Sequence, residues 1–107
     1  MAKHAPPIDL YALELRDEPE NRQFVLRFGG HRVRVEYERD MDRIFLTSLI
    51  VPKELEPVGV GDVLLEKVLI HVDEKRWKVV PTHPAIKAYM RLHPAWQRLL
   101  LKGVQLR

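Results

Sequence analysis

Residues 43–72 read RIFLTSLIVPKELEPVGVGDVLLEKVLIHV, and a change of period within this stretch decides the fold. Residues 43–51 are almost continuously apolar and β-branched, which is the pattern of a central strand buried on both faces. Pro52 ends that strand. From Gly61 onward the apolar residues recur at the helical period of about 3.6 and form one stripe: Leu64, Leu65, Val68, Leu69 and Val72. The stretch therefore predicts a strand, a turn and an amphipathic helix in succession.

The sequence before this stretch predicts two paired strands. Side chains alternate in residues 24–28 and again in residues 33–37, on either side of the pair Gly29-Gly30. Two alternating runs around a two-residue glycine connection indicate a β-hairpin. Residues 9–16 are ambiguous, with a short edge strand as one interpretation, and residues 17–21 have the composition of a turn.

The sequence after this stretch predicts one more strand and two helical segments. Residues 77–80 form a short buried strand that Pro81 stops, and Pro84 and Pro94 each suit a first helical position. The predicted order is therefore β-β-β-α-β-α-α, an antiparallel meander followed by a crossover helix and a strand parallel to the third. This order predicts the α/β (α+β) class with a mixed sheet.

The composition indicates one globular domain. A chain of 107 residues is near the common domain size, and 46% apolar residues is ordinary for a globular protein. We expect residues 1–8 to be a flexible lead and residues 9–107 to be the single domain. Because the chain has no cysteine, a disulfide, a thiolate nucleophile and a zinc–thiolate site are excluded.

Charge and hydropathy narrow the class of partners. The formal charge of +3 and the pI near 9.4 suit an anionic ligand but fall well short of a nucleic-acid signature. The longest apolar run, residues 44–52, is too short to span a bilayer, and residues 1–8 lack the apolar core of a secretory signal. We therefore expect a cytoplasmic protein without a membrane partner. The spacing of the histidines predicts no metal site.

The segment EPVGVGDVL, residues 56–64, lies between the central strand and the helix. Helix starts leave backbone N–H groups unpaired and bind phosphates well, and Gly59 and Gly61 would let a ligand approach the backbone closely. The segment is not a dinucleotide fingerprint, because Leu64 stands where a third glycine is needed, and it is not a P-loop, because Asp62 follows Gly61. The alternative is that the two glycines only loosen the start of the helix.

The order of elements around this segment resembles that of the GNAT superfamily of acyl-coenzyme-A-dependent N-acetyltransferases. Residues 56–61 fall on the Q/R-x-x-G-x-G/A pattern of that superfamily. The chain is most similar to a minimal branch of about one hundred residues, and the resemblance covers roughly residues 22–100. The further matching residues are Val51-Pro52, Glu54-Leu55, Pro81-Thr82-His83-Pro84, Tyr89 and His93-Pro94.

This resemblance implies an acetyl-coenzyme-A-dependent N-acetyltransferase that acts on an unidentified amine. The pantetheine arm would run beside the backbone of Leu49, Ile50 and Val51, and the pyrophosphate would meet backbone N–H groups of the glycine segment. The residues of that segment are Val58, Gly59, Val60, Gly61, Asp62 and Val63. No metal is implied, and the sequence leaves the oligomeric state and the identity of the acyl group open.

Two residues are candidates for the chemistry of acetyl transfer. His83 stands where the branch has a cysteine, and it is either a general base or a residue whose side chain bonds locally at a helix start. Tyr89 is either the acid that protonates the leaving thiolate or a core aromatic residue with a hydrated hydroxyl. Lys87 and Arg91 lie four residues apart on one helix face, where they would contact coenzyme A phosphates or simply face solvent.

The sequence also departs from the family pattern, which keeps other functions open. Glu56 occupies the Q/R position and brings negative charge toward the expected pyrophosphate, and Pro57 has no N–H to donate. A second hypothesis is therefore a GNAT-like fold without catalysis that acts as a coenzyme-A-binding or protein-interaction module. A third is a nucleic-acid-binding sheet with a basic face and Tyr37 as a stacking platform, which Glu20 and Glu36 interrupt. Its basic residues would be Arg27, Arg32 and Arg34.

Overall fold

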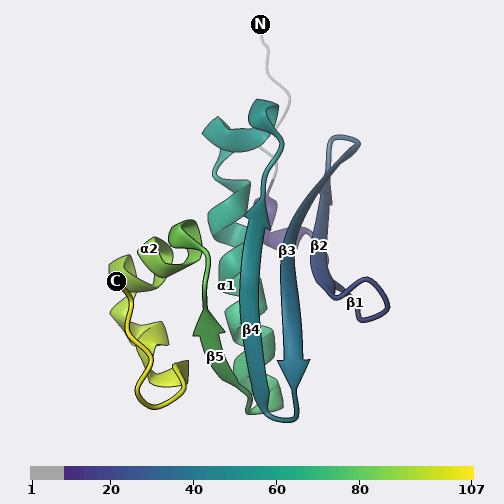
Figure 1. Cartoon of the computed structure of the whole chain (residues 1–107). Coiled ribbons are helices and arrows are strands. Elements are labelled where there is room, and N and C mark those ends of the chain that lie inside the picture. The colour runs from purple at the N-terminus through teal and green to yellow at the C-terminus, as the bar shows by residue number, and fades with distance from the viewer. Residues whose placement is uncertain (1–8) are drawn as a thin grey trace, which may run out of the picture.

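A computed structural model describes residues 9–107 of the chain, so the expected lead of residues 1–8 lies outside the described residues. Five strands, two α-helices and three short 3-10 helices form a mixed α+β fold (Figure 1). The first part comprises η1 (Leu10–Ala12), β1 (Arg16–Glu18), β2 (Gln23–Phe28), β3 (His31–Asp40) and β4 (Arg43–Ile50). The second part comprises η2 (Lys53–Val58), α1 (Val60–Lys75), β5 (Lys78–Pro81), α2 (Pro84–Leu92) and η3 (Pro94–Leu99).

The five strands form one sheet in the order β1-β2-β3-β4-β5. Neighbouring strands are antiparallel except for β4 and β5, which are parallel and are joined through α1. The predicted meander, crossover helix and parallel strand are therefore confirmed. The predicted hairpin is also confirmed, because Gly29 and Gly30 both adopt positive φ, 56° and 80°, as a two-residue turn between twisted strands requires.

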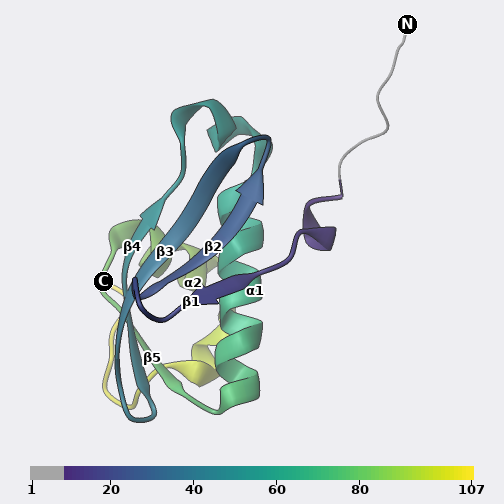
Figure 2. The ribbon, with the colours of Figure 1, turned by 90° about the vertical axis from the view of Figure 1, so that its right-hand side faces the viewer.

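The hydrophobic core lies between α1 and one face of the sheet. Figure 2 shows α1 running along that face. The predicted stripe of α1 is buried, with relative exposures of 0–1%. Facing it from the sheet are the buried side chains of Phe24, Leu26, Val33, Val35, Tyr37, Ile44, Leu46 and Val79.

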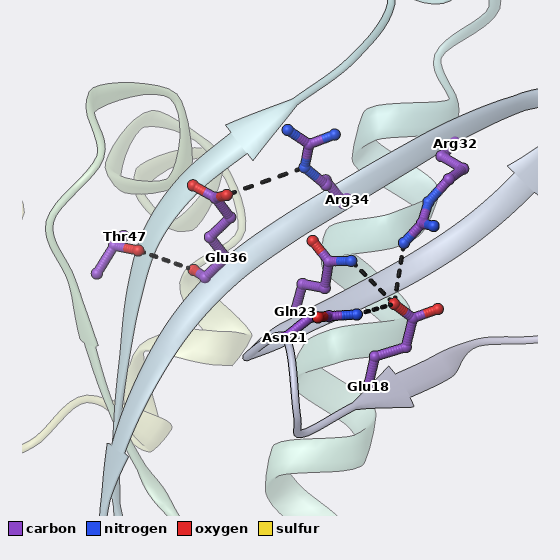
Figure 3. A network of polar contacts seen from close by, with 7 residues as sticks. All are labelled: Glu18, Asn21, Gln23, Arg32, Arg34, Glu36 and Thr47. Atoms are coloured by element: carbon purple, nitrogen blue, oxygen red, sulfur yellow. Dashed lines mark hydrogen bonds and ion pairs between the residues drawn. The ribbon is translucent and has the colours of Figure 1, made fainter.

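The opposite face of the sheet carries a polar network. One carboxylate oxygen of Glu18 accepts hydrogen bonds from Asn21, Gln23 and Arg32, at 3.2, 2.9 and 2.9 Å (Figure 3). Tyr37 points to the other side, where it is 6% exposed and its hydroxyl donates to Asp17. The prediction of Tyr37 as a stacking platform beside the arginines is therefore wrong, because the alternation of the strand directs Tyr37 into the core.

The prediction that the central strand is buried on both faces is also wrong. In β4 only Ile44 and Leu46 are fully buried, and its other residues are half-buried apart from the exposed Arg43. The physical reason is that α1 covers a single face of the sheet, so the outward side chains of β4 keep contact with water.

The two ends of the described chain differ from the sequence prediction in detail. The edge strand lies at residues 16–18 instead of 9–16, because Asp9 caps a 3-10 turn by accepting the N–H of Tyr11. The last helical segment is a 3-10 helix. His93, which precedes Pro94, has an extended φ of −129°, so α2 ends and only a short 3-10 segment follows.

Within residues 9–107 no helix has both the length and the apolar character needed to cross a membrane. The same residues contain no group of three or more His, Asp or Glu side chains arranged to hold a metal ion.

Candidate functional site

The strands β4 and β5 separate half-way along β4. They pair from Arg43 opposite Lys78 as far as Leu46 opposite Pro81, and the N–H of Thr82 then donates to the carbonyl of Leu46 at 3.0 Å. Beyond Leu46, β4 pairs with β3 alone. The last residues of β4 therefore have a free edge on the side of α2.

A β-bulge in β4 coincides with this separation. In the register with β3, Ser48 lies opposite Glu36 and Leu46 lies opposite Tyr37, so Thr47 is the extra residue. The hydroxyl of Thr47 donates to the carbonyl of Glu36 at 3.1 Å, as Figure 3 shows. Because a bulge bends its strand and increases the local twist, Thr47 helps to direct the end of β4 away from β5.

A cleft of about 410 Å³ opens where the strands have separated. Its walls are the end of β4, the junction of η2 with α1, and the start of α2. It is lined by Leu49, Val51, Glu56, Gly59, Gly61, Asp62 and Ala85. Its volume lies within the range of roughly 300–1,000 Å³ that is usual for small-molecule sites.

The two glycines of the sequence motif shape this cleft. Gly59 ends η2 and begins α1 with φ of 82°, a conformation that side-chain-bearing residues rarely adopt. At Gly61, a Cβ atom would lie 3.1 Å from Cγ2 of Val51 and 3.7 Å from Cδ2 of Leu49. The absence of a side chain at Gly61 therefore lets α1 begin close against the end of β4.

The start of α1 presents fewer free N–H groups than the sequence predicts. Gly59 donates its N–H to the carbonyl of Glu56, and Val63 donates to the carbonyl of Gly59, both at 3.4 Å. Across residues 9–107, no acceptor contacts the N–H groups at positions 60–62. The side chains of Val60 and Val63 are buried in the core, and that of Val58 is 41% exposed.

The charged side chains of the cleft are both acidic. Glu56 comes from η2 and Asp62 from the first turn of α1, whereas no Lys, Arg or His belongs to the described lining. A carboxylate in the first turn of a helix is favoured by the helix dipole. The chain thus provides its own anions where an anionic ligand would be expected.

His83 is the N-cap of α2. Its Nδ1 accepts the N–H of Ala85 at 3.2 Å, so a neutral imidazole carries its proton on Nε2 in this arrangement. The ring is half-buried. The local bonding that the sequence left as one alternative is therefore present, at a position two residues before the cleft-lining Ala85.

Tyr89 lies one helical turn after Ala85 and is 7% exposed. Burial raises the pKa of Tyr89 to about 12, and the nearby carboxylates of Glu66 and Asp62 add to this shift. Its ring stacks on that of His93 with the centroids 4.0 Å apart. The hydroxyl of Tyr89 therefore stays protonated at neutral pH and is able to donate a hydrogen bond.

The cleft does not include the two basic residues that the sequence suggested for phosphate binding. Lys87 donates to the main-chain oxygen of Arg107 at 3.1 Å, and Arg91 donates to that of Leu106. On a helix, Lys87 lies about 200° around from Ala85, so it points away from the cleft. Both basic side chains therefore bind the main chain of residues 106–107 and do not contact the cleft lining.

Of the strand residues predicted to lie along the ligand, Leu49 and Val51 line the cleft, and Ile50 does not. Sequence reasoning missed Thr47 and Ala85. Polar residues at positions 47 and 48 inside an apolar run are the signal that a bulge interrupts the strand. No sequence signal singles out Ala85, an exposed alanine directly after the helix-starting Pro84.

Comparison with known proteins adds one finding to this geometry. Residues 23–99 match a family model described as GCN5-related N-acetyl-transferase. The match runs from β2 to the end of η3 and includes every residue that lines the cleft. A comparison with curated proteins finds no match.

Proposed function

Because the chain belongs to the GCN5-related N-acetyltransferase family, we propose that it transfers an acetyl group from acetyl-coenzyme A to an amine. The cleft between β4 and α2 is the proposed site. The observation that carries the proposal is the position of this cleft, at the bulge where β4 leaves β5 and beside the glycine-rich start of α1. Family membership by itself supports a general acetyltransferase-like function and leaves the acceptor open.

The apolar part of the cleft suits an acyl thioester arm. Leu49, Val51 and Ala85 offer an apolar wall, and the missing side chain at Gly61 keeps the space beside Val51 open. The free edge of β4 offers backbone hydrogen bonds to an extended amide chain, in the manner of an added strand. When bound, acetyl-coenzyme A would supply a thioester whose carbonyl carbon is open to attack by an amine.

His83 is the proposed general base. A neutral imidazole has one ring nitrogen that can accept a proton, which suits removal of a proton from an attacking amine. The lone pair of Nδ1 is used by the N–H of Ala85, so this atom takes a proton only when that bond opens. The capping bond and the proton therefore compete for the same atom.

Tyr89 is the proposed donor to the leaving sulfur. A thiol with a pKa near 8.5 is a stronger acid than a Tyr89 hydroxyl with a pKa of about 12. Full transfer of the proton from Tyr89 is therefore unfavourable, whereas a hydrogen bond from its hydroxyl stabilises negative charge on sulfur without that transfer.

A second candidate function is a binding module of this family that does not catalyse acetyl transfer. It is favoured by Glu56 and Asp62, which make the cleft acidic, and by the capping bond of His83. Ligand binding without acetylation of any member of an amine panel would support this second candidate. Acetylation that depends on His83 would reject it.

Isothermal titration with acetyl-coenzyme A tests the primary proposal. We expect binding to the natural chain and at least about 10-fold weaker binding to Gly61→Val, because the new side chain would collide with Val51 and fill the cleft. Ala95→Val, which adds bulk at an exposed position outside the cleft lining, is the matched control and should bind normally. Absence of heat at millimolar ligand with the natural chain would contradict the proposal.

A further inference from the structure

The acidic lining of the cleft bears on how the proposed acyl donor is recognised. Coenzyme A joins a neutral pantetheine arm to a nucleotide that carries several negative charges. The cleft offers Glu56 and Asp62 as its charged side chains, and both repel such a nucleotide. The charged side chains of the cleft therefore repel the nucleotide of coenzyme A but do not repel its neutral pantetheine arm.

The basic residue nearest in sequence to these carboxylates, Lys53 of η2, is exposed and outside the cleft lining, and three other basic residues near the cleft are bound elsewhere. Lys87 and Arg91 bind the main chain of residues 106–107. Lys67, on α1, donates to the main-chain oxygen of Tyr11 at 2.7 Å. None of the three lines the cleft.

The dipole of α1 is also opposed by the chain itself. The helix contributes about half a positive charge at its N-terminus. Asp62 in its first turn and Glu56 just before it together contribute two negative charges. The free N–H groups at residues 60–62 therefore lie in a region where the net side-chain charge is negative.

The remaining lining suits an uncharged ligand. Leu49, Val51 and Ala85 are apolar, and Gly59 and Gly61 leave the backbone accessible. Amide groups of a pantetheine arm bond to backbone without adding charge. Resting on the proposed function, we infer that this cleft recognises its acyl donor through the neutral pantetheine arm and thioester, and that it does not hold the pyrophosphate.

Binding of two donors to the natural chain tests this inference. Titrations would compare acetyl-coenzyme A with S-acetylpantetheine, each at low salt and at about 0.3 M salt, where charge repulsion is largely screened. We expect the two affinities to lie within about 3-fold of one another at high salt. We also expect acetyl-coenzyme A to bind more tightly as salt is raised, and S-acetylpantetheine to change little.

A matched pair of variants identifies the carboxylate responsible. Glu56→Gln should tighten the binding of acetyl-coenzyme A at low salt by about 3- to 5-fold, the size expected for an exposed charge, and leave S-acetylpantetheine unchanged. Glu54→Gln removes a neighbouring carboxylate that lies 3.9 Å from His31 and outside the cleft lining, so it should change neither affinity.

Two outcomes would overturn the inference, and they differ in what they mean for the proposed function. If acetyl-coenzyme A binds more than about 30-fold more tightly than S-acetylpantetheine and weakens as salt is raised, the pyrophosphate is held, and only the inference fails. If neither donor binds at millimolar concentration, the proposed function fails and the inference fails with it.

Discussion

At the scale of single residues, His83 shows what sequence can and cannot predict. Its position before Pro84 gave two interpretations, and both depend on what lies within reach of one ring nitrogen. The structure gives that nitrogen a partner, the N–H of Ala85. The contacts of Lys87 and Arg91 could not be predicted in this way. Helical spacing predicts that the two side chains share a face, but it does not predict that residues 106–107 lie against that face.

Substitution of His83 separates its capping role from its proposed role as a base. His83→Ala should lower the free energy of unfolding by about 1 kcal/mol, because the N–H of Ala85 loses its acceptor. His83→Asn should recover most of that loss, since asparagine is a good N-cap, and urea unfolding measures both. If acetyl transfer is found, the Asn variant should transfer about 100-fold more slowly. An Asn variant with normal stability and an undiminished rate would leave His83 with the capping role alone.

At the scale of elements, the change of period in residues 43–72 predicted β4 and α1, because buried strands and amphipathic helices each leave a pattern along several residues. The bulge at Thr47 and the position of the three-residue β1 were not predicted. A bulge is a register shift between two strands, and a short edge strand owes its position to a few side-chain contacts with distant residues. Neither feature can be predicted from the local spacing of apolar residues.

The strand β1 is attached to the core by the hydrogen bond from the hydroxyl of Tyr37 to Asp17, at 2.7 Å. Tyr37→Phe keeps the ring that packs on Phe24 and should cost about 1–2 kcal/mol of unfolding free energy, as for a bond to a charged acceptor. In a double-mutant cycle with Asp17→Ala, most of this cost should appear as coupling. Equal effects of Tyr37→Phe with and without Asp17 would contradict this role.

The same bond has a predictable dependence on pH. Burial and the bond to Asp17 raise the pKa of Tyr37 above its ordinary value near 10. Above pH 10 the unfolded chain therefore releases the Tyr37 proton before the folded chain does, so the free energy of unfolding falls as pH rises. Tyr37→Phe should remove the part of this fall in unfolding free energy that comes from Tyr37. Urea unfolding of the natural chain and the variant at pH 8 and pH 11 measures the difference.

At the scale of the whole molecule, one helix and one sheet face make a single core. The core lies between α1 and the sheet, and the far side of the sheet carries the polar network around Glu18 (Figures 2 and 3). The cleft lies at the end of this core, where β4, α1 and α2 meet. A substitution that disrupts the packing of the core should therefore also change the shape of the cleft.

If residues 9–107 form a single domain, as the sequence predicts, they should unfold cooperatively. Leu69→Ala, at a fully buried position of α1, should lower the free energy of unfolding by about 2–5 kcal/mol, which is a large share of the 5–15 kcal/mol typical of a domain. Ile70→Ala removes a similar side chain that is 43% exposed, so it is the matched control and should cost less than half as much.

The two tryptophans provide the measurement of that cooperativity. Trp77 follows α1 and Trp96 lies in η3, so tryptophan fluorescence reports on the second half of the fold, whereas far-ultraviolet circular dichroism reports on all its helices and strands. In a single cooperative domain the two signals give the same urea midpoint, and Leu69→Ala shifts both midpoints together. Separate midpoints, or a shift in one signal alone, would show that residues 9–107 do not unfold as one unit.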